Sequence, residues 1–206
     1  MPESDRSRAL AASCGLLAAA LALIVPLVAG RLEPGYSHRA QFISELGAQG
    51  AAHGGIVSVA GFGTIGALVL AFLALAHRAF PATRRTMGGI FGVALVGVAY
   101  LIAAVFRCDA GCPATGSLSQ LLHNSFGLLE YVGAVIGFAL LAAAFRASPR
   151  WRSLSPMCAA CALGVAVGLV AMLTPALAPE RGISQRVAEV AIFGWIAVVA
   201  WRLRAS

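Results

Sequence analysis

Six long apolar stretches constrain this chain more than any other feature of its sequence. They lie at about 9–30, 53–77, 87–106, 121–145, 154–177 and 186–202. Each approaches the roughly 20 residues that a helix needs to cross the hydrocarbon core of a bilayer. Backbone groups in lipid must be hydrogen-bonded within their own segment, and the stretches lack the alternation of barrel strands. The sequence therefore predicts an all-α polytopic membrane protein, a bundle of six transmembrane helices.

The composition supports a single membrane domain that covers residues 1–206. Hydrophobic residues make up 60% of the chain and charged residues 11%, whereas a soluble domain carries roughly a quarter charged residues. The first apolar stretch follows MPESDRSR and has the general form of a signal peptide. It is longer than a typical signal-peptide core, and five similar stretches follow it, so we expect it to be retained as the first span.

The net charge of +7 comes from fifteen arginines and no lysine. The arginines lie in short connections between apolar stretches, which is typical of topology signals and argues against nucleic acid as a partner. Ten lie on one side of the predicted bundle and five on the other, and the five are Arg31, Arg39, Arg107, Arg181 and Arg186. Ten arginines against five predict a multi-pass protein of the cell membrane with both termini in the cytoplasm.

Polar residues concentrate on the predicted outer side, where the first connection (31–52) is the longest. Polar groups at membrane depth are costly and tend to line cavities, so this asymmetry predicts an outward-facing polar pocket. Within the first connection, the apolar residues from His38 to Leu46 are roughly helix-spaced. This spacing predicts a short helix that lies in the membrane interface.

Three side chains are the candidates for acid–base chemistry or metal binding. His123 lies about one turn into the fourth span, on the same helix face as Ser119 and Glu130. Asp109 and Glu45 belong to the connections on the same side of the membrane. The alternative is a structural histidine that bonds a neighbouring helix, together with two solvated loop acids.

Further polar side chains are candidates for ligand binding, and they are Ser44, Ser117, Gln120, Glu130, Arg186 and Glu189. Glu130 lies about nine residues into its span, roughly 13 Å deep. It predicts either a proton-linked group or a protonated glutamate that joins helices, with Tyr100 and Thr64 as expected partners. Glu189 follows Arg186 by three residues, and this spacing favours a local ion pair.

The cysteines divide by location. Cys108 and Cys112 flank Asp-Ala-Gly in an outer connection, where an oxidising compartment permits a disulfide, and we predict one there. The other three cysteines lie within or near spans and are interpreted as packing residues. The sequence identifies neither a cofactor nor a metal, and it carries none of the common nucleotide-binding, zinc-protease or serine-hydrolase motifs.

Two stretches, GYSHRAQFISELGA and FRCDAGCPATGSLSQLLHN, resemble an uncharacterised prokaryotic membrane family (domain of unknown function 998). The residues that carry the resemblance are Tyr36, Ser37, Ser44, Glu45, Leu46, Gly47, Phe106, Cys108, Asp109, Gly111 and His123. The resemblance implies a six-helix membrane protein and supplies no mechanism.

Residues 116–131 are also similar to the alkaline ceramidase and adiponectin-receptor superfamily of intramembrane zinc hydrolases. The similarity consists of Gly116-Ser117, His123 and the Glu130-Tyr131 pair. Those hydrolases also carry a histidine pair near the C-terminus, and this chain has no histidine after His123. Most of their metal site is therefore missing here.

Three functions remain open at this point. The first is an enzyme that acts on a lipid or small amphiphile at the outer face, with Glu45, Asp109 and His123 as its acid–base or metal-binding groups. The second is a carrier or ligand-binding protein with Glu130 as a proton-linked residue. The third is an accessory membrane subunit whose polar residues only hold helices together. Membrane lipids are expected partners, a small molecule or a lipid is the candidate ligand at the outer face, and the sequence indicates no oligomeric state.

Overall fold

The computed structural model describes residues 3–204, which form helices and connections without a strand. Six helical segments in this range are long and apolar enough to cross a membrane, which confirms the predicted fold class. Five of them are built around α1 (Glu3–Leu32), α4 (Arg84–Val105), α5 (Leu118–Arg146), α6 (Ser155–Leu173) and α7 (Arg181–Arg204). The remaining one combines α2 (Gly54–Ile56), the π-helical turn η2 (Val57–Phe62) and α3 (Gly63–Ala76).

Four short 3₁₀ helices complete the chain: η1 (Ile43–Gly47), η3 (His77–Ala79), η4 (Arg152–Leu154) and η5 (Pro175–Glu180). The last span differs from its predicted range, because η5 and α7 continue one another from Pro175 to Arg204. The prediction of a helix in the membrane interface over His38–Leu46 is wrong. Only η1 forms there, and it is buried because Ile43 and Leu46 pack into the main core of the bundle.

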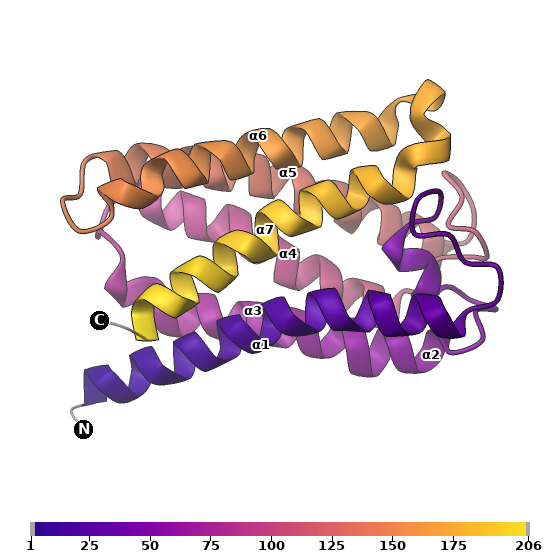
Figure 1. Ribbon diagram of the computed structural model, residues 1–206, viewed down its shortest axis with the longest axis horizontal. Helices are drawn as coiled ribbons and strands as arrows, with labels where there is room; N and C mark the ends of the chain where they lie inside the picture. Colours follow the sequence, from indigo (N-terminus) through magenta and orange to yellow (C-terminus); the bar gives the residue numbers. More distant parts are fainter. Residues whose placement is uncertain (1–2, 205–206) are drawn as a thin grey trace.

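The six segments form a closed ring in which each helix packs against its neighbours in the order α1, α3, α4, α5, α6, α7 and back to α1 (Figure 1). α1 begins and α7 ends at the same end of the bundle (Figure 1). We call this the arginine end, and it carries the connections 77–83 and 147–154. The opposite end is called the loop end and carries the connections 33–53, 106–117 and 174–180.

Glycines allow the closest helix contacts. A Cβ atom on Gly92 of α4 would lie 2.8 Å from the Cα of Gly137 in α5, and one on Gly168 of α6 would lie 2.9 Å from the Cβ of Ala188 in α7. Such small residues let backbones approach in lipid, where no hydrophobic effect drives helices together. The helix starts are also specified locally, since the Ser117 hydroxyl accepts a hydrogen bond from the Gln120 amide at the start of α5.

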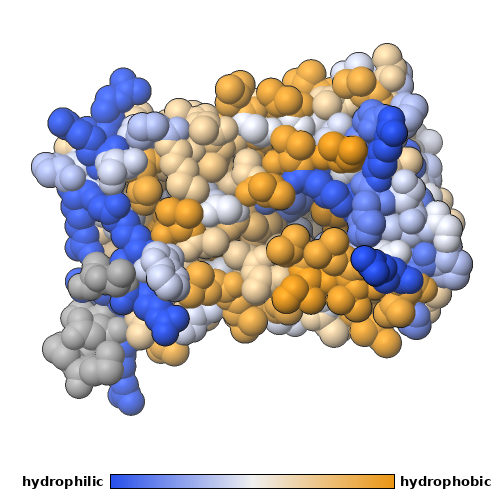
Figure 2. Space-filling model, viewed as in Figure 1, coloured by the Kyte–Doolittle hydropathy of each residue, from blue (hydrophilic) through white to orange (hydrophobic). Residues whose placement is uncertain are grey.

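Aromatic side chains pack the interior of the bundle toward the arginine end. Toward the arginine end, aromatic rings fill the ring of helices, with the centroid of Phe80 5.0 Å from Trp151 and that of Phe138 5.3 Å from Trp195. On the face that Figure 2 shows, the surface between the ends is largely apolar. The bundle exposes large apolar side chains such as Phe91 and Val190. A surface of this kind suits lipid as its solvent.

Candidate functional site

The first connection folds back over the loop end as a cap, here defined as residues 36–49. Three arginines from other elements bind its carbonyl groups. Arg107 donates to the carbonyl of Gly47 (2.7 Å), and Arg181 donates to that of Ala40 (3.1 Å). Arg186 donates to the carbonyl of His38 (2.8 Å). Regular helix hydrogen bonds do not pair these backbone carbonyl groups of the connection. The arginines therefore supply their hydrogen-bond donors.

Arg186 also binds two side chains of the cap. Its Nη2 donates to the Tyr36 hydroxyl (2.7 Å) and to Nδ1 of His38 (2.8 Å). A guanidinium has no acceptor, so the His38 ring is neutral with its proton on Nε2. Burial and the charges of Arg186 and Arg31 lower the pKa of His38. Burial raises the pKa of Tyr36, and Arg186 opposes part of this shift.

Glu45 is the central acid of the cap and is 8% exposed. Its carboxylate accepts hydrogen bonds from Arg181 Nη2 (3.1 Å), the Phe42 amide (2.9 Å) and Gln41 Nε2 (2.9 Å). A cation and two neutral donors thus bind this carboxylate. It caps the start of η1 through the Phe42 amide and joins η1 to α7 through Arg181.

The second connection, 106–117, packs beside the cap. Cys108 and Cys112 are joined by a disulfide, and the intervening Gly111 adopts a positive φ of 76°, which favours glycine. The Asp109 carboxylate accepts bonds from the Ser117 amide (2.8 Å) and hydroxyl (2.7 Å). These bonds lower the pKa of Asp109. Gln120 holds the same turn by accepting from the Asp109 amide (2.7 Å).

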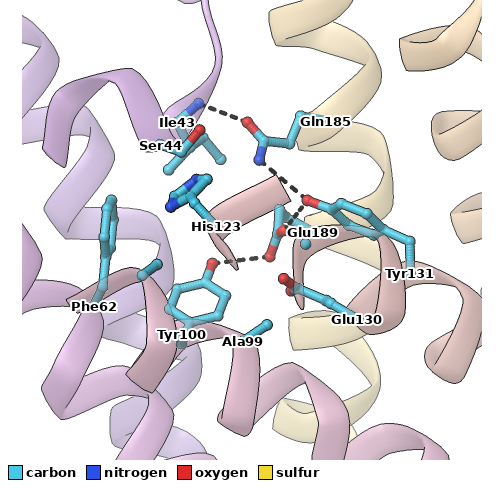
Figure 3. A pocket seen from close by; sticks show the side chains of 12 residues that line it. Ile43, Ser44, Phe62, Ala99, Tyr100, His123, Glu130, Tyr131, Gln185 and Glu189 are labelled. Atoms are coloured by element: carbon cyan, nitrogen blue, oxygen red, sulfur yellow. Dashed lines mark hydrogen bonds between the residues drawn. The ribbon is translucent and has the colours of Figure 1, made fainter. Parts of the chain in front are cut away.

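A polar pocket of about 60 Å³ lies beneath the cap, inside the ring of helices (Figure 3). Its lining comes from η1, η2, α4, α5 and α7. The lining residues are Ile43, Ser44, Phe62, Ala99, Tyr100, Ala103, His123, Gly127, Glu130, Tyr131, Gln185 and Glu189. A volume of this size holds a few water molecules or one small polar group, and it is much smaller than the usual drug-sized site of roughly 300–1,000 Å³.

A chain of hydrogen bonds connects the cap to the interior of the pocket (Figure 3). The Ile43 amide donates to Gln185 (2.6 Å), whose amide group donates to the Tyr131 hydroxyl (3.1 Å). Tyr131 in turn donates to Glu189 (2.7 Å). Tyr100 donates to the other carboxylate oxygen of Glu189 (3.0 Å). Glu189 is therefore held by two hydroxyl groups from two different helices.

Glu130 lies next to Glu189 in the pocket and is bonded differently. It is 6% exposed, and its buried Oε1 atom has no hydrogen-bond partner among the described residues. Figure 3 shows its carboxyl group facing the Glu189 side chain. A buried polar atom without a partner costs roughly 1–3 kcal/mol, and more when the group is charged. Such a group is unusual in a folded protein and indicates a missing partner.

His123 lines the same pocket closer to the cap. Its Nδ1 lies 3.1 Å from the Phe106 carbonyl. A carbonyl can only accept, so Nδ1 carries a proton, and in the neutral ring Nε2 is left as an acceptor. The ring is thus oriented by the second connection while it contributes to the pocket wall (Figure 3).

A family profile described as "Protein of unknown function (DUF998)" matches residues 16–202. The match covers all six spans in whole or in large part. The chain belongs to this family. No curated protein and no solved structure matches the chain.

The residues that carry the family resemblance all gather at the loop end. Tyr36, Glu45 and Gly47 belong to the cap, whereas Cys108 and Asp109 shape the second connection. Most of them bond backbone or neighbouring loop groups. These residues therefore build the cap and the second connection, while only Ser44 and His123 among them line the pocket.

The three residues predicted to act together in catalysis do not converge. His123 bonds the Phe106 carbonyl, Asp109 bonds Ser117 and Gln49, and Glu45 bonds Arg181. Asp109 and Glu45 are absent from the pocket lining. Ser117 and Gln120, predicted as ligand contacts, lie outside the pocket lining, where they cap α5 and hold the Asp109 turn.

The ion pair predicted between Arg186 and Glu189 does not form. Arg186 turns toward the cap, where carbonyl groups, Tyr36 and His38 take its donors, and Glu189 turns to the two tyrosines. Helical spacing allowed the pair, but both side chains find partners on other elements. The partners expected for Glu130 are also wrong, because Tyr100 bonds Glu189 and Thr64 is exposed on the surface.

One group of metal-ligand side chains occurs among the described residues, and it consists of Cys108, Cys112 and His123. Their ligand atoms lie within 4.8 Å of one another. The two sulfur atoms are bonded to each other, so neither offers the thiolate that binds a metal. The donor set does not fit a metal in this form of the protein.

Proposed function

We propose that this protein is a ligand-binding membrane protein whose polar pocket takes a small cationic group that donates hydrogen bonds. Glu130 and Glu189 provide the negative charge, and the observation that carries the proposal is the unpartnered Oε1 atom of Glu130. An ammonium group has three donors and a positive charge, so it would satisfy this atom and offset both carboxylates.

The charges around the pocket support a cation over an anion. Two carboxyl groups contribute to the lining, and His123 is the only basic residue among the lining side chains. Arg186, the nearest arginine along α7, directs its Nη atoms to the cap and Gly182. Buried charges are normally paired, and here the pair is incomplete on the positive side.

We further propose that the pocket faces the outside of the cell, with both termini in the cytoplasm. Ten arginines belong to the end where α1 begins and α7 ends, and the positive-inside rule assigns that end to the cytoplasm. The Cys108–Cys112 disulfide at the opposite end agrees, because disulfides persist in oxidising compartments. The two arguments use different residues and different chemistry.

The test is binding of ethylammonium to the protein in lipid nanodiscs, measured by saturation-transfer NMR with ethanol as the neutral probe. We expect the wild-type protein to bind ethylammonium at least tenfold more tightly than ethanol. Glu130→Gln keeps the shape of the side chain but removes its charge, so it should weaken ethylammonium binding at least tenfold. Ethanol binding should not change.

The matched control is Glu180→Gln, which alters an acid at the loop end that pairs with Arg39 and does not line the pocket. This variant should bind ethylammonium as the wild type does. Equal binding of ethylammonium and ethanol would overturn the proposal, and so would equal loss of binding in the Glu130 and Glu180 variants. An accessory subunit without a ligand would give the first of these results.

A further inference from the structure

A second cavity lies between α1 and α7 and opens on the side of the bundle. Its volume is about 320 Å³, within the usual range for small-molecule sites. The lining is mostly apolar and comprises Ala19, Ala22, Leu23, Pro26, Leu27, His38, Ile43, Arg186, Glu189, Val190, Phe193, Gly194 and Ala197. We call this cavity the lateral groove. Figure 2 shows hydrophilic side chains that reach from the loop end into the apolar surface on this face.

The lateral groove and the polar pocket share two lining residues. Ile43 and Glu189 line both cavities. Below Glu189 the groove continues along α7 through Gly194 to Ala197, which at 1.5 Å per residue extends about 12 Å toward the arginine end. The apolar part of the groove thus begins where the acidic group of the pocket is found.

Two glycines without packing contacts keep the cavities open. An added Cβ atom would meet no heavy atom within 4 Å at Gly127, which lines the pocket, or at Gly194, which lines the groove. Gly92 and Gly137, in contrast, are required by close helix contacts. Glycine inside a helix costs roughly 1 kcal/mol of stability relative to alanine. Close helix packing does not explain the glycines at these two positions.

From these observations we infer that the ligand is a cationic amphiphile with one alkyl chain, whose ammonium group lies at Glu130 and Glu189 and whose chain lies in the lateral groove. The inference rests on the proposed function and adds the chemical class of the ligand. An anionic headgroup suits the site less well. The Nη donors of Arg186 are already bonded to the cap and Gly182, whereas Glu130 lacks a donor.

The first experiment compares decylammonium and ethylammonium binding in nanodiscs, with variants that fill one cavity each. Gly194→Leu places a side chain in the groove, and Gly127→Leu places one in the pocket. We expect Gly194→Leu to weaken decylammonium binding at least tenfold and to leave ethylammonium binding unchanged. Gly127→Leu should weaken both. Every comparison uses the same membrane, so partition of the probe into lipid cancels.

The second experiment locates the chain. A decylammonium probe with a diazirine at the end of its chain is photolysed in the nanodisc, and the labelled residues are identified by mass spectrometry. We expect labels on residues 19–27 of α1 and 190–197 of α7. A neutral alcohol with the same chain and diazirine should label lipid-facing residues of α6, such as Leu163 and Val170, as strongly as the groove.

The outcomes separate the two proposals. Absent ethylammonium binding overturns the proposed function. Ethylammonium binding that depends on Glu130, together with decylammonium binding that Gly194→Leu does not weaken, overturns only the inference about the chain. Equal labelling of the groove by the alcohol and the ammonium probe has the same consequence, because an ordinary lipid chain then fills the groove. If Gly194→Leu fails to fold, Ala197→Leu fills the same groove and is held to the same expectation.

Discussion

Two buried glutamates at the loop end have opposite environments. Glu45 in the cap is 8% exposed, and its carboxylate is bonded by Arg181, Gln41 and the Phe42 amide. Glu130 in the pocket is 6% exposed, and its Oε1 atom has no partner among residues 3–204. The two side chains are similarly buried, so their difference lies in hydrogen bonding rather than in exposure.

This difference separates structural polarity from polarity that awaits a ligand. A buried carboxylate that is fully bonded contributes to the fold, and its removal leaves its partners unpaired. A buried carboxylate without partners costs stability and is retained for another reason. The same chemical substitution at the two positions should therefore act on stability in opposite directions.

Glu45→Gln should produce the largest loss of stability. The amide removes the negative charge opposite Arg181, and it places an NH₂ group against the side-chain amide of Gln41. We expect the free energy of unfolding to fall by about 3 kcal/mol, at the low end for a broken buried pair because Arg181 is partly exposed. Thermal unfolding followed by circular dichroism in detergent would show a midpoint about 6–12 °C lower.

The control for this prediction is Glu180→Gln, which removes the same charge from the exposed pair with Arg39. Exposed ion pairs contribute roughly 0–1 kcal/mol, so its midpoint should stay within about 4 °C of the wild type. An equal shift in both variants would mean that Glu45 is no more important to the fold than a surface acid.

Replacing Cys108 and Cys112 together by serine should have the next largest effect. The disulfide closes a ring of only a few residues, and the entropy model gives about 2 kcal/mol for a loop of this length. We expect a midpoint about 4–8 °C lower in the double variant. Cys158→Ser and Cys161→Ser, which alter free buried thiols, serve as controls for the chemistry of the change. A double variant as stable as the wild type would mean that the disulfide does not stabilise the loop end.

The fold could be predicted from the sequence because its physical cause is local. Each span is an uninterrupted apolar stretch, and a bilayer leaves such a stretch almost no alternative to a helix. The range of the last span was less accessible. Residues 175–185 are more polar than the rest of the span, and they are helical because η5 and α7 continue one another.

The site could be predicted only in part, because side-chain partners in the cap come from distant positions. Arg181 and Arg186 were interpreted as topology signals, but they bond residues that precede them by more than 130 positions. Glu130 was identified from its depth within an apolar span. Its neighbour Glu189 was assigned to Arg186, since the spacing along one helix cannot reveal Tyr100 and Tyr131 on two other helices.

Glu130→Gln should have a smaller effect on stability, and its sign should be opposite to that of Glu45→Gln. The substitution replaces a buried carboxyl group whose Oε1 atom forms no hydrogen bond among the described residues. We expect the midpoint to stay within about 1 °C of the wild type or to rise by a few degrees. Measurement in detergent without amines avoids stabilisation by a ligand. A fall as large as that of Glu45→Gln would show that Glu130 is bonded in the folded protein and that the comparison is wrong.

The smallest effect concerns pH and returns to the cap. Burial, with the charges of Arg186 and Arg31, lowers the pKa of His38 below its ordinary value of about 6.5. The unfolded chain therefore binds a proton more readily than the folded protein does. The stability that neutral His38 contributes is complete above about pH 6.5 and is lost as the pH falls through the lower pKa of the folded state.

Protonation at Nδ1 also removes the acceptor that Arg186 uses and places two positive groups side by side. The midpoint of the wild type should fall between pH 7.5 and pH 5, whereas His38→Gln, which does not titrate, should show a smaller fall. Other groups titrate equally in both proteins, so the difference between the two curves reports His38. Parallel curves would mean that His38 leaves the cap before it is protonated, and Arg186 alone would then hold Tyr36 and the carbonyl groups of the cap.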